Sequence, residues 1–95
     1  MRNYELVFII HPEIDEDTAP ELIERVENLI ERNEGKVTNV ERWGMRRLAY
    51  TIKGQDEGSY VLMHFELEPQ RVKAVEQGLK LIEDVIRHMI TRREE

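Results

Sequence analysis

A tryptophan and two adjacent arginines stand close together in the segment Trp43-Gly44-Met45-Arg46-Arg47. The residues that follow, Leu48 to Lys53, alternate between larger apolar side chains and small or polar ones, which indicates a strand with one buried face. Paired guanidinium groups beside an aromatic ring suit contacts with phosphate and stacking on a nucleobase. We therefore predict that this segment projects beyond the core and contacts nucleic acid. The alternative is a charged turn surrounded by water.

The charge of the chain is unevenly distributed. The net charge is −6 at pH 7, which by itself argues against a nucleic-acid binder. Residues 13–34, however, hold nine acidic and two basic side chains, a balance of −7, which leaves +1 for the rest of the chain. Basic side chains gather in residues 42–47 and 87–93. This asymmetry permits RNA contact on one side while the acidic segment faces water or a basic protein.

Composition excludes several classes of function. The chain has no cysteine, so disulfides and thiolate metal sites are ruled out. No apolar run is long enough to span a bilayer, and no secretory signal stands at the start. The three histidines, His11, His64 and His88, have no acidic residue at a spacing typical of a metal site or a catalytic triad. We expect one domain over residues 1–95, working in the cytoplasm, without catalytic activity, cofactor or metal, and with a free tail from about residue 92.

The hydrophobic pattern predicts six elements in the order strand, helix, strand, strand, helix, strand. Their expected limits are a strand over 2–10, a helix between Thr18 and Gly35, strands over 37–53 and 59–68 joined by a loop over 54–58, a helix from Pro69, and a strand over 85–91. Thr18 and Glu21 fit a capping box, and Gly35 fits a left-handed helix cap. This order predicts an α+β chain with the ferredoxin-like split β-α-β fold, a four-stranded antiparallel sheet with two helices on one face.

Alternation along the strands assigns side chains to the two faces of the sheet. The residues expected to face the helices are Leu6, Phe8, Ile10, Leu48, Tyr50, Ile52, Val61, Met63, Phe65 and Leu67. The opposite face is expected to hold Val7, Ile9, Ala49, Tyr60, Leu62, His64, Glu66, Arg87 and Met89. An apolar face without helices is typical of a protein-binding site, so we assign partner binding to Val7, Ile9, Tyr60, Leu62, His64 and Met89. The alternative is the opposite parity in the last strand, with Arg87 and Met89 inside.

Five segments together resemble a known family. They are Met1-Arg2-Asn3-Tyr4-Glu5-Leu6-Val7-Phe8-Ile9-Ile10-His11-Pro12, Glu34-Gly35-Lys36-Val37, Trp43 to Tyr50, Tyr60-Val61-Leu62-Met63, and Asp84-Val85-Ile86-Arg87-His88-Met89-Ile90. In this order and spacing they resemble the bacterial small ribosomal subunit protein six family. The resemblance implies a structural protein that pairs with the small basic ribosomal protein eighteen and binds the central domain of small-subunit rRNA.

The resemblance also implies which residues are functional. The matching positions are Arg2, Tyr4, Trp43, Gly44, Arg46, Arg47, Tyr60 and Arg87. With the basic residues of the charge pattern, the expected RNA-binding set is Arg2, Tyr4, Arg42, Trp43, Arg46, Arg47, Arg87, Arg92 and Arg93. Thr51 is a departure, since many members of the family have proline there.

Two other classes share the predicted topology. An RNA-recognition module that reads single strands would need a basic residue before a glycine and then exposed aromatics, whereas Glu57-Gly58-Ser59-Tyr60 supplies an acid and one aromatic. A small-molecule-binding regulatory domain would need glycine and polar groups at its helix–strand junctions, and Glu34-Gly35 alone offers little. Both remain alternatives to the ribosomal interpretation.

Overall fold

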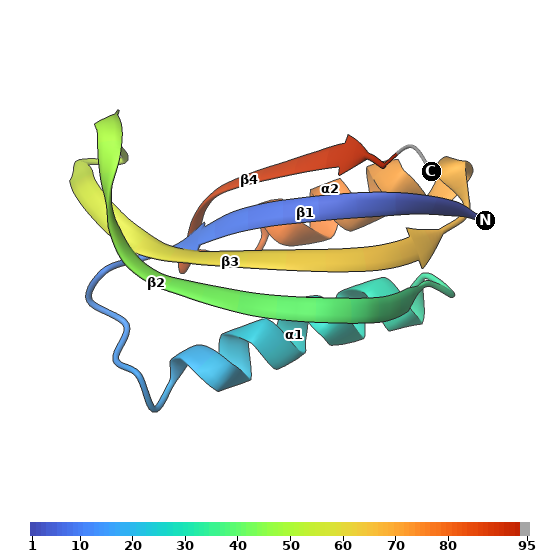
Figure 1. Ribbon diagram of the computed structural model, residues 1–95, viewed down its shortest axis with the longest axis horizontal. Coiled ribbons are helices and arrows are strands. Elements are labelled where there is room, and N and C mark those ends of the chain that lie inside the picture. The colour runs from blue at the N-terminus through green and yellow to red at the C-terminus, as the bar shows by residue number, and fades with distance from the viewer. Residues whose placement is uncertain (94–95) are drawn as a thin grey trace.

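Four strands form one antiparallel sheet, and two helices cover one of its faces (Figure 1). The computed structural model describes residues 1–93. Its elements are β1 (Arg2–Ile10), α1 (Ala19–Arg32), β2 (Lys36–Ile52), β3 (Gln55–Leu67), a 3-10 turn (Pro69–Arg71), α2 (Val72–Lys80) and β4 (Val85–Arg92). The strands lie in the order β2-β3-β1-β4, and each paired strand is antiparallel to its neighbour. The predicted element order and α+β class are confirmed.

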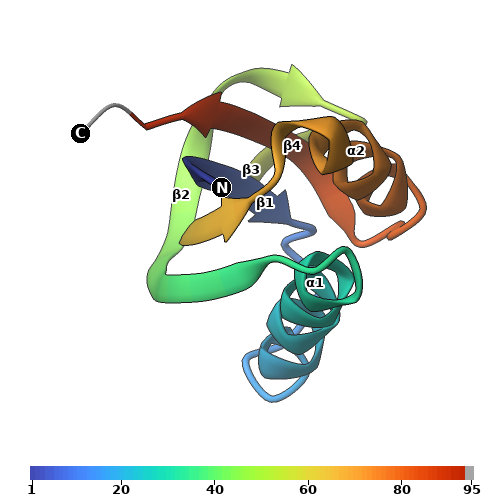
Figure 2. The same ribbon diagram turned by 90° about the vertical axis from the view of Figure 1, so that its right-hand side faces the viewer.

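The main core lies between the helices and the two central strands. Alternate residues of β1 and β3 are buried there, as the alternation predicts, and the apolar stripes of α1 and α2 pack on them. The fully buried side chains of this core include Leu6, Phe8, Ile10, Val61, Met63, Phe65, Leu67, Val26, Ile30, Val75 and Leu79. Both helices therefore pack on the same face, as Figure 2 shows from the end of the sheet.

The ends of α1 differ from the prediction in their details. Thr18 makes no side-chain cap, so the expected capping box is absent. Asp15 bonds there instead, because its Oδ1 accepts the backbone N–H of Thr18 at 2.8 Å. Hydrogen bonds to the side chain and backbone of Thr18 lower the pKa of Asp15. After the helix, Glu34 rather than Gly35 has a left-handed backbone, with φ of 67°.

Gly35 is required for space rather than for its backbone angles. A Cβ added there would lie 2.7 Å from Ile30 Cγ2 and 2.9 Å from the Glu66 carbonyl oxygen. Such distances are shorter than van der Waals contact, so the end of α1 and the end of β3 come close only because this residue has no side chain.

The hairpin between β2 and β3 is tighter than predicted. Lys53 and Gly54 form a two-residue turn with φ of 49° and 80°, and Ile52 pairs with Gln55. Positive φ at both positions is characteristic of a type I′ turn. The expected loop over 54–58 is therefore wrong, because β3 already begins at Gln55 and pairs with the end of β2.

The long hairpin bends over the face that carries no helix. The pairing of β2 with β3 shifts register at three places, and in Figure 2 the far end of β2 arches above β4. Leu48 and Ile52 consequently pack against Ile9 and Ile86 in a second, smaller cluster. The prediction that Leu48, Tyr50 and Ile52 face the helices is wrong, since each bulge resets the alternation of the strand. Tyr50 is exposed.

The register of β4 confirms its predicted parity. Met89 lies opposite Val7 and Arg87 opposite Ile9, on the helix-free face. A register shift at Ile9/Ile10 leaves Ile86 unpaired, so that Val85 packs in the main core and Ile86 in the second cluster.

The last strand extends slightly further along the chain than the expected range of 85–91. Arg92 pairs with Tyr4 within the sheet, and the Arg93 backbone N–H donates to the Asn3 carbonyl at 2.8 Å. The predicted free tail does not begin at Arg92, and its last two residues, 94 and 95, lie outside the described part of the chain.

Gly58 provides a test of how tightly the hairpin packs. A Cβ there would lie 2.3 Å from Ile9 Cγ2 and 3.2 Å from the Ile10 carbonyl oxygen. We expect Gly58→Ala to lower the free energy of unfolding by about 1–3 kcal/mol, the usual cost of overpacking. Urea denaturation measures this change. Gly54→Asn is the matched control. A Cβ added at Gly54 would have no neighbouring atom within 4 Å in the described structure, and asparagine tolerates positive φ. Equal stability of both variants and the wild type would contradict the packing described.

Candidate nucleic-acid interface

Trp43 occupies a bulge in β2. Arg42 pairs with Val61 and Gly44 with Tyr60, so Trp43 is the extra residue, and Gly44 has φ of 84°. The Trp43 ring stacks on Tyr60 with centroids 6.5 Å apart and planes within 10° of parallel. The Trp43 residue is 41% exposed.

Polar groups hold this tryptophan in place. Its indole Nε1–H donates to Glu41 Oε1 at 3.3 Å, and Asn39 Nδ2 donates to the other oxygen of Glu41 at 3.0 Å. On the same strand, the Arg46 guanidinium carbon lies 5.4 Å from the centre of the Trp43 ring, within the range of a cation–π contact. We call the group of Tyr60, Trp43 and Arg46 the aromatic–arginine stack.

Arg46 and Arg47 are both exposed on the projecting part of the hairpin, where the sequence places them. They lie opposite Gly58 and Glu57. Because successive residues of a strand point to opposite sides, Arg47 leaves the hairpin on the side away from Arg46. Only Arg46 can join the aromatic–arginine stack.

Arg42 differs from its neighbours. Its Nη2 lies 3.0 Å from Glu16 Oε2, which ties β2 to the acidic loop before α1. Both side chains are exposed, so this ion pair contributes little stability. The predicted RNA-binding role of Arg42 therefore competes with an acidic neighbour.

Three more of the predicted RNA-binding arginines lie at the other end of the sheet. The β1 and β4 pairing brings Arg2, Arg92 and Arg93 close together there. Arg46 lies opposite Gly58, just beyond the Ile10 end of β1. Ile10 is eight residues from Arg2, which is roughly 27 Å at the usual rise per strand residue. The arginines therefore form two groups rather than one.

Tyr4 belongs to the core. It is 7% exposed and stacks on Phe65 with ring centroids 5.6 Å apart. A ring packed in this way offers little surface to RNA, so the predicted contact does not involve an open aromatic face.

Arg87 fastens the hairpin to β4. Its Nη1 donates a hydrogen bond to the Tyr50 hydroxyl, and its guanidinium lies 5.8 Å from the centre of the Tyr50 ring. Beneath this contact is a groove of about 200 Å³. Its walls are mainly apolar and come from Val7, Ile9, Leu48, Ala49, Tyr50, Ile52, Tyr60, Arg87, His88 and Met89.

The six predicted partner-binding residues share the helix-free face but differ in exposure. Across the sheet, Met89, Val7 and Leu62 form one row. Met89 is 53% exposed, whereas Leu62 is 6% exposed, and the hairpin covers Ile9. His64 Nε2 lies 3.1 Å from Glu5 Oε1. Leu62 is therefore almost closed to water in this structure, and Met89 is the open apolar position of this row.

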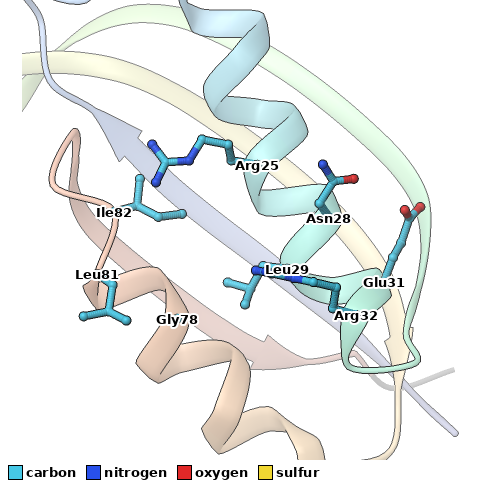
Figure 3. A pocket seen from close by; sticks show the side chains of 8 residues that line it. All are labelled: Arg25, Asn28, Leu29, Glu31, Arg32, Gly78, Leu81 and Ile82. Carbon is cyan, nitrogen blue, oxygen red and sulfur yellow. The ribbon is translucent and has the colours of Figure 1, made fainter.

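A larger groove lies between the helices (Figure 3). It measures about 670 Å³ and is lined by Arg25, Asn28, Leu29, Glu31, Arg32, Gly78, Leu81 and Ile82. The Arg25 and Arg32 side chains reach into it from α1. Gly78 lets the helices approach closely, because a Cβ there would lie 2.4 Å from Leu29 Cδ1. Sequence reasoning missed this groove, although the seven-residue spacing of the two arginines places them two turns apart on one helix face.

Other chemistry finds little support in residues 1–93. No three histidine, aspartate or glutamate side chains of this range gather as a metal ion would require. None of the helices described is both long and apolar enough to cross a membrane. Burial lowers the pKa of His88, an effect that Glu76 partly offsets, which favours the neutral imidazole.

The chain is similar to known proteins over nearly all of its length. The sequence model of the family described as ribosomal protein S6 matches residues 3–92. Small ribosomal subunit protein bS6 of Carboxydothermus hydrogenoformans is 40% identical over 92 residues, which cover 97% of this chain and 96% of that protein. The bS6 protein of Moorella thermoacetica is 42% identical over 95 residues, which cover 100% of this chain and 97% of that protein.

Solved structures agree with this similarity. The crystal structure of 30S ribosomal protein S6 from Thermotoga maritima matches with a TM-score of 0.90 at 39% identity, covering 97% of this chain and 87% of that one. The C-terminal domain of the MgtC protein from Mycobacterium tuberculosis matches with a TM-score of 0.59 at 14% identity, covering 100% of this chain and 90% of that one. The second likeness concerns the fold alone.

Proposed function

Because this chain belongs to the ribosomal protein S6 family, we propose that it is a structural component of the bacterial small ribosomal subunit. In this role it binds the central domain of small-subunit rRNA together with the small basic ribosomal protein eighteen. It works in the cytoplasm, on the ribosome, and catalyses no reaction. The relatives that match it over almost their whole length are named as proteins of the small ribosomal subunit, which supports the assignment.

One observation supports the mode of binding best: two groups of arginines lie at opposite ends of the sheet, and the helix-free face between these ends has an apolar groove. Arg46 and Arg47 stand on the projecting hairpin, and Arg2, Arg92 and Arg93 gather at the opposite end. Exposed guanidinium groups at two separated points fix the position of an RNA backbone without reading its sequence. The face between them, with Met89 and the groove beneath Tyr50, is left for a protein.

Electrostatics supports the need for a basic partner. The chain carries a net charge of −6, so its long-range field does not attract phosphate. In 0.15 M salt, screening acts over about 8 Å, which is much shorter than the distance between the two arginine groups. Each arginine group therefore attracts RNA independently of the other group, and only weakly. A positively charged protein docked between them would extend the basic surface.

The hairpin arginines can be tested directly. We expect Arg46→Ala with Arg47→Ala to weaken binding of the partner complex to central-domain rRNA, because phosphate contacts are lost. Each lost contact should lower the slope of log affinity against log salt by roughly one unit. Filter binding at several salt concentrations measures both effects.

The matched control removes two arginines from the helix side. Arg25→Ala with Arg32→Ala changes the charge by the same amount but lies in the groove between α1 and α2. It should bind RNA like the wild type. Equal RNA affinity of the hairpin variant and this control would reject the hairpin as an RNA contact.

Met89 tests the partner face. We expect Met89→Asp to leave the free protein folded, since the residue is 53% exposed, and to abolish binding of the basic partner. A charge buried without a counterion in the complex costs several kcal/mol. Melting temperature and calorimetric titration with the partner report the two effects.

Two further variants serve as controls for this experiment. Val61→Asp should unfold the domain, because Val61 is fully buried in the main core. Leu81→Asp adds the same charge at an 80% exposed position on the helix side and should bind the partner normally. Normal partner binding by Met89→Asp would show that the partner docks elsewhere.

The partner requirement can be measured without any mutation. We expect labelled central-domain rRNA to bind the free protein poorly in 0.15 M salt and to bind well when the basic partner is added, because the partner supplies the missing positive charge. Tight, saturable binding by the free protein would mean that its RNA site is self-sufficient.

A further inference from the structure

We propose that the aromatic–arginine stack of Tyr60, Trp43 and Arg46 receives one unpaired RNA base, which lies against the exposed part of the Trp43 ring. The inference rests on the proposed RNA-binding function and specifies one contact within it. A tryptophan at the edge of a small sheet is 41% exposed, although its ring would be better shielded from water by burial. The exposure of the Trp43 ring is explained if its open part is a binding surface that the neighbouring groups hold in position.

The ring is held in position before any RNA arrives. The bulge at Gly44 sets the backbone, Tyr60 lies parallel to the ring, and Glu41 accepts the indole N–H. Asn39 in turn holds the Glu41 carboxylate at 3.0 Å. Tyr60 itself packs against the second cluster formed by Ile9, Leu48 and Ile86, which ties the platform to the body of the protein. A ring fixed in this way loses little freedom when a base stacks on it.

Arg46 supplies the second half of the contact. Its guanidinium lies over the Trp43 ring, 5.4 Å from the ring centre, and the residue is exposed, so the side chain can move aside when a base stacks there. A planar guanidinium can lie against a base or donate to the phosphate of the same nucleotide. The carboxylate of Glu41 lies at the indole N–H and repels phosphate there, so the backbone approaches from the side of Arg46.

These groups also determine which RNA can bind. Bases within an A-form helix are stacked on one another, and only their edges are accessible, so an open ring face requires a base outside a duplex. The indole N–H is already bonded to Glu41, so the ring offers its face and no free donor. The contact should therefore tolerate any base, as stacking platforms do.

The single tryptophan of the chain makes the contact directly observable. The partner complex is titrated with central-domain rRNA and with a blunt-ended RNA duplex that has no unpaired base. Fluorescence of Trp43 is obtained as the difference between the wild type and Trp43→Phe. We expect the rRNA to quench this signal and the duplex to leave it unchanged at equal occupancy.

Affinity measurements complete the test. Trp43→Ala should lower affinity for the rRNA roughly tenfold, as loss of one stacked base does, while Trp43→Phe, which keeps a ring, should stay within about threefold of wild type. Met45→Ala is the matched control, an exposed apolar side chain two residues along the same strand, and should change nothing. Melting temperatures verify that each variant is folded.

The possible outcomes separate this contact from the proposed function. Tight rRNA binding without quenching, or with full affinity in folded Trp43→Ala, would overturn the stacking contact and leave the ribosomal function intact. Failure of the wild-type complex to bind the rRNA at all would overturn both.

Discussion

The packing of the long hairpin against Ile9 is the interaction on which the rest of this surface depends. Gly58 brings the β3 backbone close to the Ile9 side chain, and Leu48 then covers Ile9 from β2. At this end, β1 is buried on both faces, by the helices on one side and by the hairpin on the other. Without this contact, Tyr60 would lose its support and the Tyr50–Arg87 hydrogen bond would have nothing to hold it in place.

Burial on both faces also explains why the helix-free face is not a simple apolar patch. The hairpin protects Ile9, Leu48 and Ile86 from water, and only part of the face, around Met89, stays open. Such an arrangement reduces the exposed apolar area of a small domain and still leaves a groove with mostly apolar walls. The protein thus keeps a binding surface without exposing all of the residues that form it.

Sequence reasoning worked where the structure repeats a simple period. The alternation in β1 and β3 and the apolar stripes of the helices predicted the element order, the fold and most of the main core. It failed for Leu48 and Ile52, because the alternation can be followed only as far as the next bulge, and a bulge has no reliable signal in one sequence. The polar run Gln55-Asp56-Glu57 resembled a loop, yet cross-strand pairing with β2 makes it a strand. Which arginines meet depends on register between distant strands, so the two groups could not be separated in advance.

The bulges of β2 have a consequence for the behaviour of the isolated chain. This strand forms one border of the sheet, and within residues 1–93 no strand lies beside its outward N–H and C=O groups. A long, flat strand in that position would be a template for pairing with a second molecule, the first step towards aggregates. Three register shifts bend this border instead. Lys36, Glu41 and Arg42 also place charged side chains along it. The irregularity that turns Trp43 onto Tyr60 therefore also helps to keep the sheet from growing beyond its four strands.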